Sequence, residues 1–91
     1  MSTNIGPSKH VTASIHDDGV VFLHTVDGRL FASNQIGARI WQALERRLPV
    51  DNIAADLSDR YRIPHETASV DITRFLVELE RQRLLERSIG Q

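Results

Sequence analysis

The four histidines are the side chains best suited to proton transfer or metal binding, and they stand at positions 10, 16, 24 and 65. None pairs with another histidine or a carboxylate at the spacing by which a helix brings two metal ligands onto one face. His16 and His24 fall on neighbouring predicted strands and can approach across a hairpin, but their interpretation as ordinary polar strand residues fits the sequence better. We therefore expect neither a metal site nor a cofactor.

The acidic pair Asp17-Asp18 is the other candidate for chemistry, because neighbouring carboxylates can share acid and base roles. Gly19 follows directly, and Asp-Gly is typical of a turn. The chain has no cysteine and lacks the GxSxG and HExxH patterns and a phosphate-binding glycine loop. Without a nucleophile and its base, we expect that the protein is not an enzyme.

Size and charge limit the classes of function that this chain can have. The 91 residues suit one domain, too small for a deep cleft between two lobes. Eleven Lys and Arg against 12 Asp and Glu give a formal charge of −1, whereas nucleic-acid binders usually carry a basic excess. No apolar run approaches the roughly 18 residues of a membrane span, and the start lacks the apolar segment of a signal peptide. We expect a cytoplasmic protein that binds neither nucleic acid nor membrane.

The elements that would position a site come as strands first and helices second. The polar residues 1–10 predict a flexible N-terminal arm. Alternating apolar residues over 11–16, a β-branched run over 20–26 and a short run over 29–33 predict three antiparallel strands. Asp27-Gly28 is the favoured pair for a two-residue hairpin between the last two strands.

Helical periodicity begins at Asn34, whose side chain can cap a helix. Apolar residues at three- and four-residue steps predict helices over about 34–48, 50–61 and 65–84, separated by Pro49 and Pro64. Gly37 inside the first helix suggests the close approach of another backbone. The predicted fold class is α+β, a three-stranded antiparallel β-meander followed by three helices over residues 11–87, similar to winged helix-turn-helix domains.

The segment DGRLFASNQIGARIWQAL at residues 27–44 resembles the PqqD family, also called RiPP recognition elements or peptide-modification chaperones. The likeness continues to about residue 86. The chain departs from the family pattern at Ser33, Arg83 and Leu48-Pro49, which leaves the subfamily and its peptide open. The residues of this segment that carry the resemblance are Asp27-Gly28, Phe31, Asn34, Gly37-Ala38 and Ile40-Trp41.

The resemblance implies a non-catalytic protein that binds the leader segment of a ribosomally made precursor peptide. It implies a partner that receives this leader, a modifying enzyme such as a radical-SAM protein, a leader peptidase or a cyclase. The product would be pyrroloquinoline quinone, a lasso peptide or another modified peptide. Neither the peptide, the enzyme nor the oligomeric state follows from the sequence, and a homodimer is one option.

We expect the leader to add as a fourth strand to the third strand of the meander, whose edge carries unpaired backbone groups. The third helix would form the other wall of the groove, with an apolar strip edged by arginines. Such a wall suits a leader with an aliphatic or aromatic anchor and nearby acids. The predicted site residues are Arg29, Leu30, Phe31, Ala32, Ser33, Val70, Arg74, Val77 and Arg81.

Several of these residues have a purely structural alternative. Phe31 suits a core position, and both faces of its hairpin are apolar, so the sequence does not tell which face meets the helices. Arg74 and Arg81 each stand one helical turn from Glu78 and can simply pair with it on a solvated face.

The alternative function is a winged-helix DNA-binding protein with its third helix in the major groove. Residues 66–87 carry four arginines against five acidic residues, so this helix is net acidic and poorly suited to DNA. A dimerisation or adaptor module is a further alternative.

Overall fold

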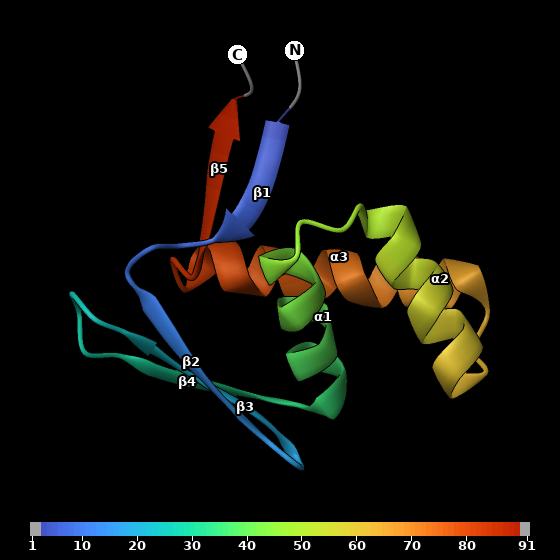
Figure 1. Ribbon diagram of the computed structural model, residues 1–91, viewed down its shortest axis with the longest axis horizontal. Coiled ribbons are helices and arrows are strands. Elements are labelled where there is room, and N and C mark those ends of the chain that lie inside the picture. The colour runs from blue at the N-terminus through green and yellow to red at the C-terminus, as the bar shows by residue number, and fades with distance from the viewer. Residues whose placement is uncertain (1–2, 90–91) are drawn as a thin grey trace.

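The part of the chain that the structure describes forms a three-stranded sheet, a two-stranded ribbon and three helices (Figure 1). A computed structural model describes residues 3–89. Antiparallel pairing gives the sheet the order β2-β3-β4, while β1 pairs with β5. The α+β class and the meander followed by three helices are thus confirmed. The elements are β1 (Thr3–Pro7), β2 (Val11–His16), β3 (Gly19–His24), β4 (Leu30–Asn34), α1 (Gln35–Glu45), α2 (Val50–Tyr61), α3 (His65–Arg81) and β5 (Leu85–Ile89).

Burial along β3 shows which face of the sheet meets the helices. Val20, Phe22 and His24 are buried, whereas Leu23 between them is exposed. Side chains alternate between the two faces of a strand, so the face that carries Phe22 is the inner face. Phe31 is the cross-strand partner of Phe22 and packs, half-buried, against the core. Phe31 is therefore a core-facing residue of β4.

The turn between β3 and β4 is wider than the predicted two-residue hairpin at Asp27-Gly28. The N–H of His24 donates to the carbonyl of Arg29 at 3.0 Å, so residues 25–28 make the turn. The His24 carbonyl accepts from the N–H of Gly28 at 2.7 Å, and its ring Nδ1 accepts from the N–H of Asp27 at 3.3 Å. Buried His24 thus organises a larger turn, in which Gly28 takes a positive φ of 73°. The observed register of β3 and β4 differs by two residues from the register that a two-residue hairpin would give. Because side chains alternate with a period of two, each residue still lies on its predicted face of the sheet.

Helix α1 lies across the inner face of the sheet. Asn34 caps it as predicted, because Asn34 Oδ1 accepts from the N–H of Gly37 at 3.0 Å. Trp41 is buried with its ring at an edge-to-face angle to Phe22, at 4.6 Å between centroids. The core that α1 shares with α2 and α3 is formed by apolar side chains at helical spacing. Its buried members on these helices include Ile40, Trp41, Leu44, Ile53, Leu57, Ile72, Leu76 and Leu79.

Helix α3 ends at Arg81, three residues before the predicted end at Leu84. The chain turns here because Arg83 adopts a positive φ of 60° and the N–H of Leu84 returns to the carbonyl of Leu79 at 2.8 Å. Leu84 is buried below the last turn. The chain then leaves as β5.

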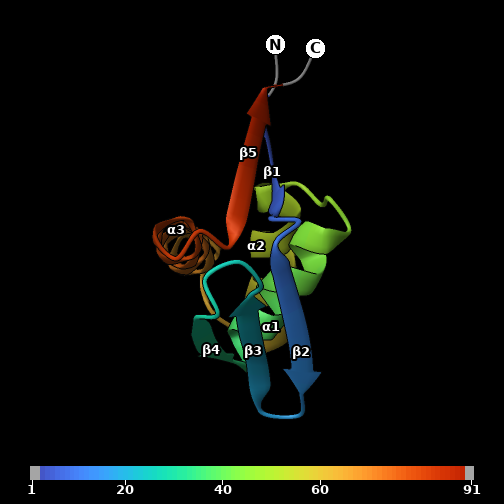
Figure 2. The same ribbon diagram turned by 90° about the vertical axis from the view of Figure 1, so that its left-hand side faces the viewer.

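Residues 3–7, which the polar sequence assigned to a flexible arm, form strand β1 and pair with β5 at the other end of the chain. The ribbon is joined to the body where the N–H of Ser8 donates to the carbonyl of Leu84 at 2.9 Å. It projects from the rest of the molecule (Figure 2). Among the described residues, no helix has the length and apolar character needed to cross a membrane.

Candidate peptide-binding edge

Among the strands of residues 3–89, β4 lies at an edge of the meander and pairs with β3 alone. In an antiparallel pair, alternate residues exchange both backbone hydrogen bonds with the neighbouring strand. The bond from His24 to Arg29 and the pairing of Phe22 with Phe31 show which residues do so. By the same alternation Ser33 points its backbone groups toward β3, together with Arg29 and Phe31.

The remaining β4 residues, Leu30 and Ala32, therefore direct their N–H and C=O groups away from β3. Their side chains are exposed on the outer face of the sheet, and Leu30 keeps 70% of its surface accessible. Phe31 and Ser33, by contrast, are half-buried toward the helices. Leu30 and Ala32 thus offer two N–H donors and two C=O acceptors along the free edge of β4.

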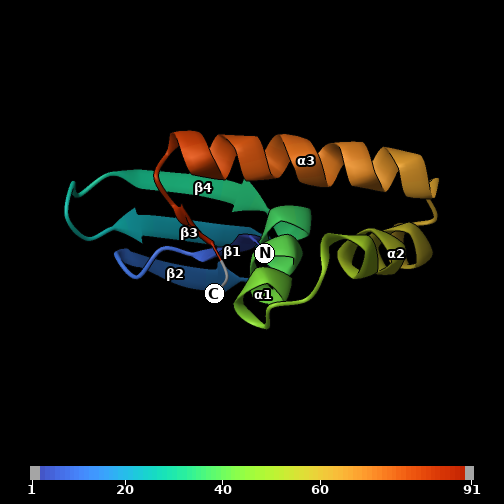
Figure 3. The same ribbon diagram turned by 90° about the horizontal axis from the view of Figure 1, so that it is seen from above.

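Helix α3 runs beside this edge (Figure 3). At one end, Arg29 donates from Nη1 to Gln82 Oε1 at 3.0 Å and from Nη2 to the Gln82 carbonyl at 2.8 Å. Gln82 in turn donates from Nε2 to Glu78 Oε2 at 3.1 Å. Farther along, the ring of Phe75 comes close to Gly37, next to the side chain of Ser33. The flank of α3 that faces β4 therefore carries Phe75, Glu78 and Gln82, all half-buried.

The four helix residues predicted for the site lie farther out. Their side chains are exposed, with Val70 and Val77 at 49% and 48% of their surface. Helical geometry places these two residues, with Arg74 and Arg81, opposite the buried stripe of α3. Val70 and Arg74 also border a hollow along the N-terminal half of the helix. The five predicted strand residues, by contrast, are gathered at or next to the β4 edge.

Sequence reasoning missed Glu78 and Gln82 as residues beside β4. The signal that was available is their four-residue spacing, which puts them on one flank, together with their position next to the apolar stripe. Their partner Arg29 was assigned to the site, but as a peptide contact. In the structure its guanidinium is already bonded to Gln82 and, at 3.3 Å, to Asp27.

His16 and His24, which could have met across the hairpin, lie at opposite ends of the β2–β3 pair. His16 stands opposite Gly19 at one end of the β2–β3 pair and His24 opposite Val11 at the other end. Within residues 3–89, no three histidine, aspartate or glutamate side chains gather as metal ligands.

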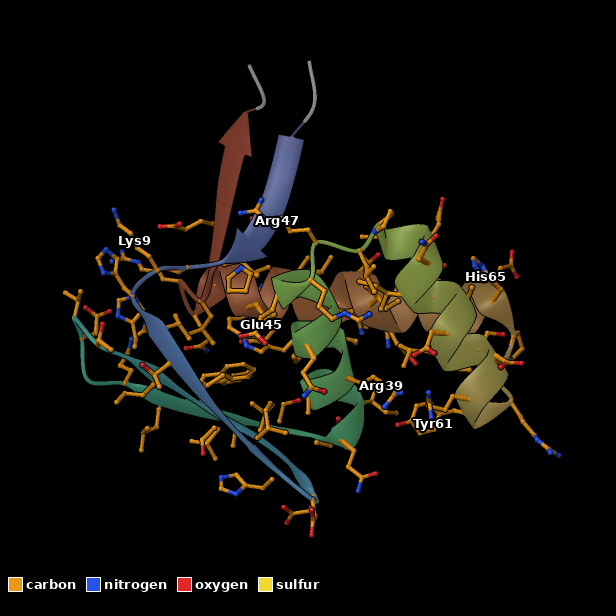
Figure 4. All side chains as sticks on the ribbon, in the orientation of Figure 1. Lys9, Arg39, Glu45, Arg47, Tyr61 and His65 are labelled. Atoms are coloured by element: carbon orange, nitrogen blue, oxygen red, sulfur yellow. The ribbon has the colours of Figure 1, made fainter. Side chains whose placement is uncertain are left out.

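A further hollow lies between α1 and α2 and is lined in part by Arg39, Ile53, Asp56 and Arg60. Arg39 extends from α1 toward α2 (Figure 4), where Nε lies 3.1 Å from Asp56 Oδ2. Arg60 lies 3.7 Å from the other oxygen of the same carboxylate. Because Asp56 pairs with both arginines, this hollow is best explained as the ionic seam between two helices.

Residues 19–85 match the family model described as coenzyme PQQ synthesis protein D, or PqqD. The chain belongs to the PqqD family. The PqqA binding protein of Rhizobium meliloti (strain 1021) is 36% identical to it over 58 residues, which are 64% of this chain and 59% of that protein. The match thus spans less than two thirds of this PqqD relative.

Two solved structures share the fold. The structure of TbiB1 in complex with the TbiA(beta) leader peptide has a TM-score of 0.84 at 30% identity, over 94% of this chain and 99% of that one. Lasso peptide synthetase B1 complexed with the leader peptide also has a TM-score of 0.84, at 20% identity, over 91% of this chain and 98% of that one. The second likeness is one of fold alone.

Proposed function

We propose that this PqqD-family protein binds the leader segment of a ribosomally made precursor peptide as an added strand on β4. The observation that carries the proposal is the pair of outward backbone positions, Leu30 and Ala32, at an edge flanked by α3. A relative at 30% identity forms a complex with a leader peptide, and the R. meliloti relative binds PqqA. Both are consistent with strand addition at this edge.

Backbone pairing alone gives an affinity that tolerates many sequences. Each net hydrogen bond contributes about 0.5–1.5 kcal/mol, and the edge offers up to four. Selectivity must then come from side chains beside the edge. We assign it to the α3 flank of Phe75, Glu78 and Gln82 first, with the outer residues Val70, Arg74, Val77 and Arg81 as a second rim.

The protein acts in this proposal as a carrier and not as an enzyme. Residues 11–87 hold the leader, and a separate modifying enzyme, such as a radical-SAM protein, a leader peptidase or a cyclase, acts on the rest of the precursor. The edge strand is short, so the remainder of a bound precursor extends beyond the domain and stays accessible to that enzyme.

Two proline substitutions at opposite edges of the sheet test the binding mode. Ala32→Pro removes an N–H that points away from β3, and Ala13→Pro does the same on β2, whose alternate residues likewise face outward. Both keep the hydrogen bonds to β3. The probes are the TbiA(beta) leader, PqqA and leaders from other PqqD-dependent precursors, measured by calorimetry.

We expect Ala32→Pro to weaken the binding of a leader at least about tenfold, which corresponds to ~1.4 kcal/mol, while Ala13→Pro leaves it unchanged. Amide NMR spectra establish that both variants are folded. Equal affinities of the two variants, or the absence of binding to every leader, would refute the proposal. Salt-dependent binding to duplex DNA would instead favour the winged-helix alternative.

A further inference from the structure

The outer face of the meander is polar along one edge and apolar along the other. Its rows run from β2 through β3 to β4, with Thr12, Leu23 and Leu30 in one row. The next row holds Ser14, Val21 and Ala32. Hydroxyl side chains thus stand at the β2 edge, while aliphatic side chains stand on β3 and β4. The apolar part of this face borders the β4 edge.

Leu30 is the most exposed member of this apolar part, at 70% of its surface, and its cross-strand partner Leu23 is 37% exposed. No described helix covers them, because the helices pack on the inner face with Phe22 (Figure 1). Directly opposite side chains on neighbouring strands lie about 4.5–5.5 Å apart and stabilise each other. Because this apolar row ends at an unpaired strand edge, Leu30 has such a neighbour on the β3 side and lacks one on the other.

Strand parity connects this row to the peptide. In an added antiparallel strand, the residues that bond to the free groups of Leu30 and Ala32 stand directly opposite them, and directly opposite residues project to the same face of a sheet. Their side chains therefore fall on the outer face, beside Leu30 and Ala32. The leader residue between them points inward, toward Phe31 and the α3 flank.

We propose that the leader extends these two rows with two apolar side chains, two positions apart in its sequence, one beside Leu30 and one beside Ala32. This inference rests on the proposed function and narrows its substrate class to leaders with an apolar–any–apolar segment in the bound strand. Beside Leu30 an aliphatic or aromatic residue extends the ladder begun by Leu23. Beside Ala32, whose side chain is small, the neighbouring site accepts a larger one. A charged leader side chain at either position loses part of its hydration next to aliphatic side chains. It gains no ion pair in return, because the outer-face positions of β2, β3 and β4 hold no Asp, Glu, Lys or Arg.

The test is a selection of random linear peptides, displayed on their own messenger RNA, against the full chain. Binders are re-measured on Ala32→Pro, on Leu30→Ser and on a matched control, Val26→Ser. Val26 is as exposed as Leu30, at 68%, but lies in the turn before β4. A second selection uses Leu30→Glu as bait.

We expect the selected peptides to carry the alternating apolar pair and not to bind Ala32→Pro. Their affinity should be about tenfold weaker for Leu30→Ser and unchanged for Val26→Ser. The Leu30→Glu bait should select a basic residue at the outward position. Binders that need Ala32 but ignore Leu30 overturn this inference and leave the proposed function standing. Binders that ignore Ala32, or a selection without binders, overturn both.

A second copy of the chain could also cover the exposed apolar row. Sedimentation of the free chain distinguishes such self-association from peptide binding. The inference predicts the same sedimentation for the unaltered chain and for Leu30→Ser. A dimer that dissociates on Leu30→Ser, with peptide affinity unchanged, would show that a second copy covers the row and would overturn the inference.

Discussion

Arg29 donates from Nη2 to the backbone carbonyl of Gln82 at 2.8 Å and so ties the start of β4 to the C-terminal end of α3. The carbonyls of the last helical turn lack partners within the helix, and a guanidinium both satisfies such a group and complements the helix dipole. One side chain thus holds together the strand edge and the helix flank that we assign to the leader.

Loss of this link should loosen the site more than it destabilises the fold. We expect Arg29→Ala to cost about 1 kcal/mol of unfolding free energy in urea, because its bonds are partly exposed, and to weaken leader binding severalfold. The control is Arg60→Ala, another exposed arginine with an ion pair inside α2, which should cost at most about 0.5 kcal/mol and leave binding unchanged. Equal effects of the two variants on leader affinity would mean that Arg29 has no role at the site.

Gly37 allows α1, β4 and α3 to come together. A Cβ at this position would lie 2.2 Å from Ser33 Oγ and 3.1 Å from Phe75 Cε1, so the close neighbours are side chains and not the backbone that the sequence suggested. Alanine normally stabilises a helix relative to glycine by about 1 kcal/mol. Here we expect Gly37→Ala to destabilise the protein by about 1–3 kcal/mol, because of overpacking.

The second substitution Ser33→Gly, which removes the nearest side chain, should restore much of the loss in the double variant. Thermal denaturation of the two single variants and of the double variant measures this coupling. A Gly37→Ala variant that melts at a higher temperature than the unaltered protein would contradict the packing described at this junction.

Asn34 is the last residue of β4 and the N-cap of α1, so it joins the strand edge directly to the helix. Its Oδ1 accepts from the N–H of Gly37, and Asn34→Ala should cost about 1 kcal/mol in urea denaturation. Asn34→Asp keeps an acceptor of the same shape and should cost less. If aspartate proves as harmful as alanine, the cap does not account for the residue.

Local patterns predicted the elements well. The Asn34 cap was correct, α2 was predicted within its observed bounds, and strand alternation placed Phe31 and Phe22 on one face. Each of these depends on neighbours within a few residues along the chain. The edge position of β4 followed from the order of the strands and was also correct.

The errors concern contacts between distant parts of the chain. β1 was missed because its partner β5 stands at the opposite end of the sequence. The turn after β3 was predicted too short because its width depends on the burial of His24 by the folded core. On α3, periodicity located the apolar stripe but did not tell which flank meets β4, so Glu78 and Gln82 were not predicted beside that strand. The outward Val70 and Val77 remain predicted site residues.

Amide hydrogen exchange, followed by NMR with and without a bound leader peptide, tests the central claim most directly. In the free chain we expect the amides of Phe31 and Ser33 to be protected and those of Leu30 and Ala32 to exchange freely. In the complex, Leu30 and Ala32 should become protected while Ala13 on the opposite edge does not change. Leu30 and Ala32 amides that remain unprotected in the complex, or protection that appears at Ala13 instead, would contradict strand addition on β4.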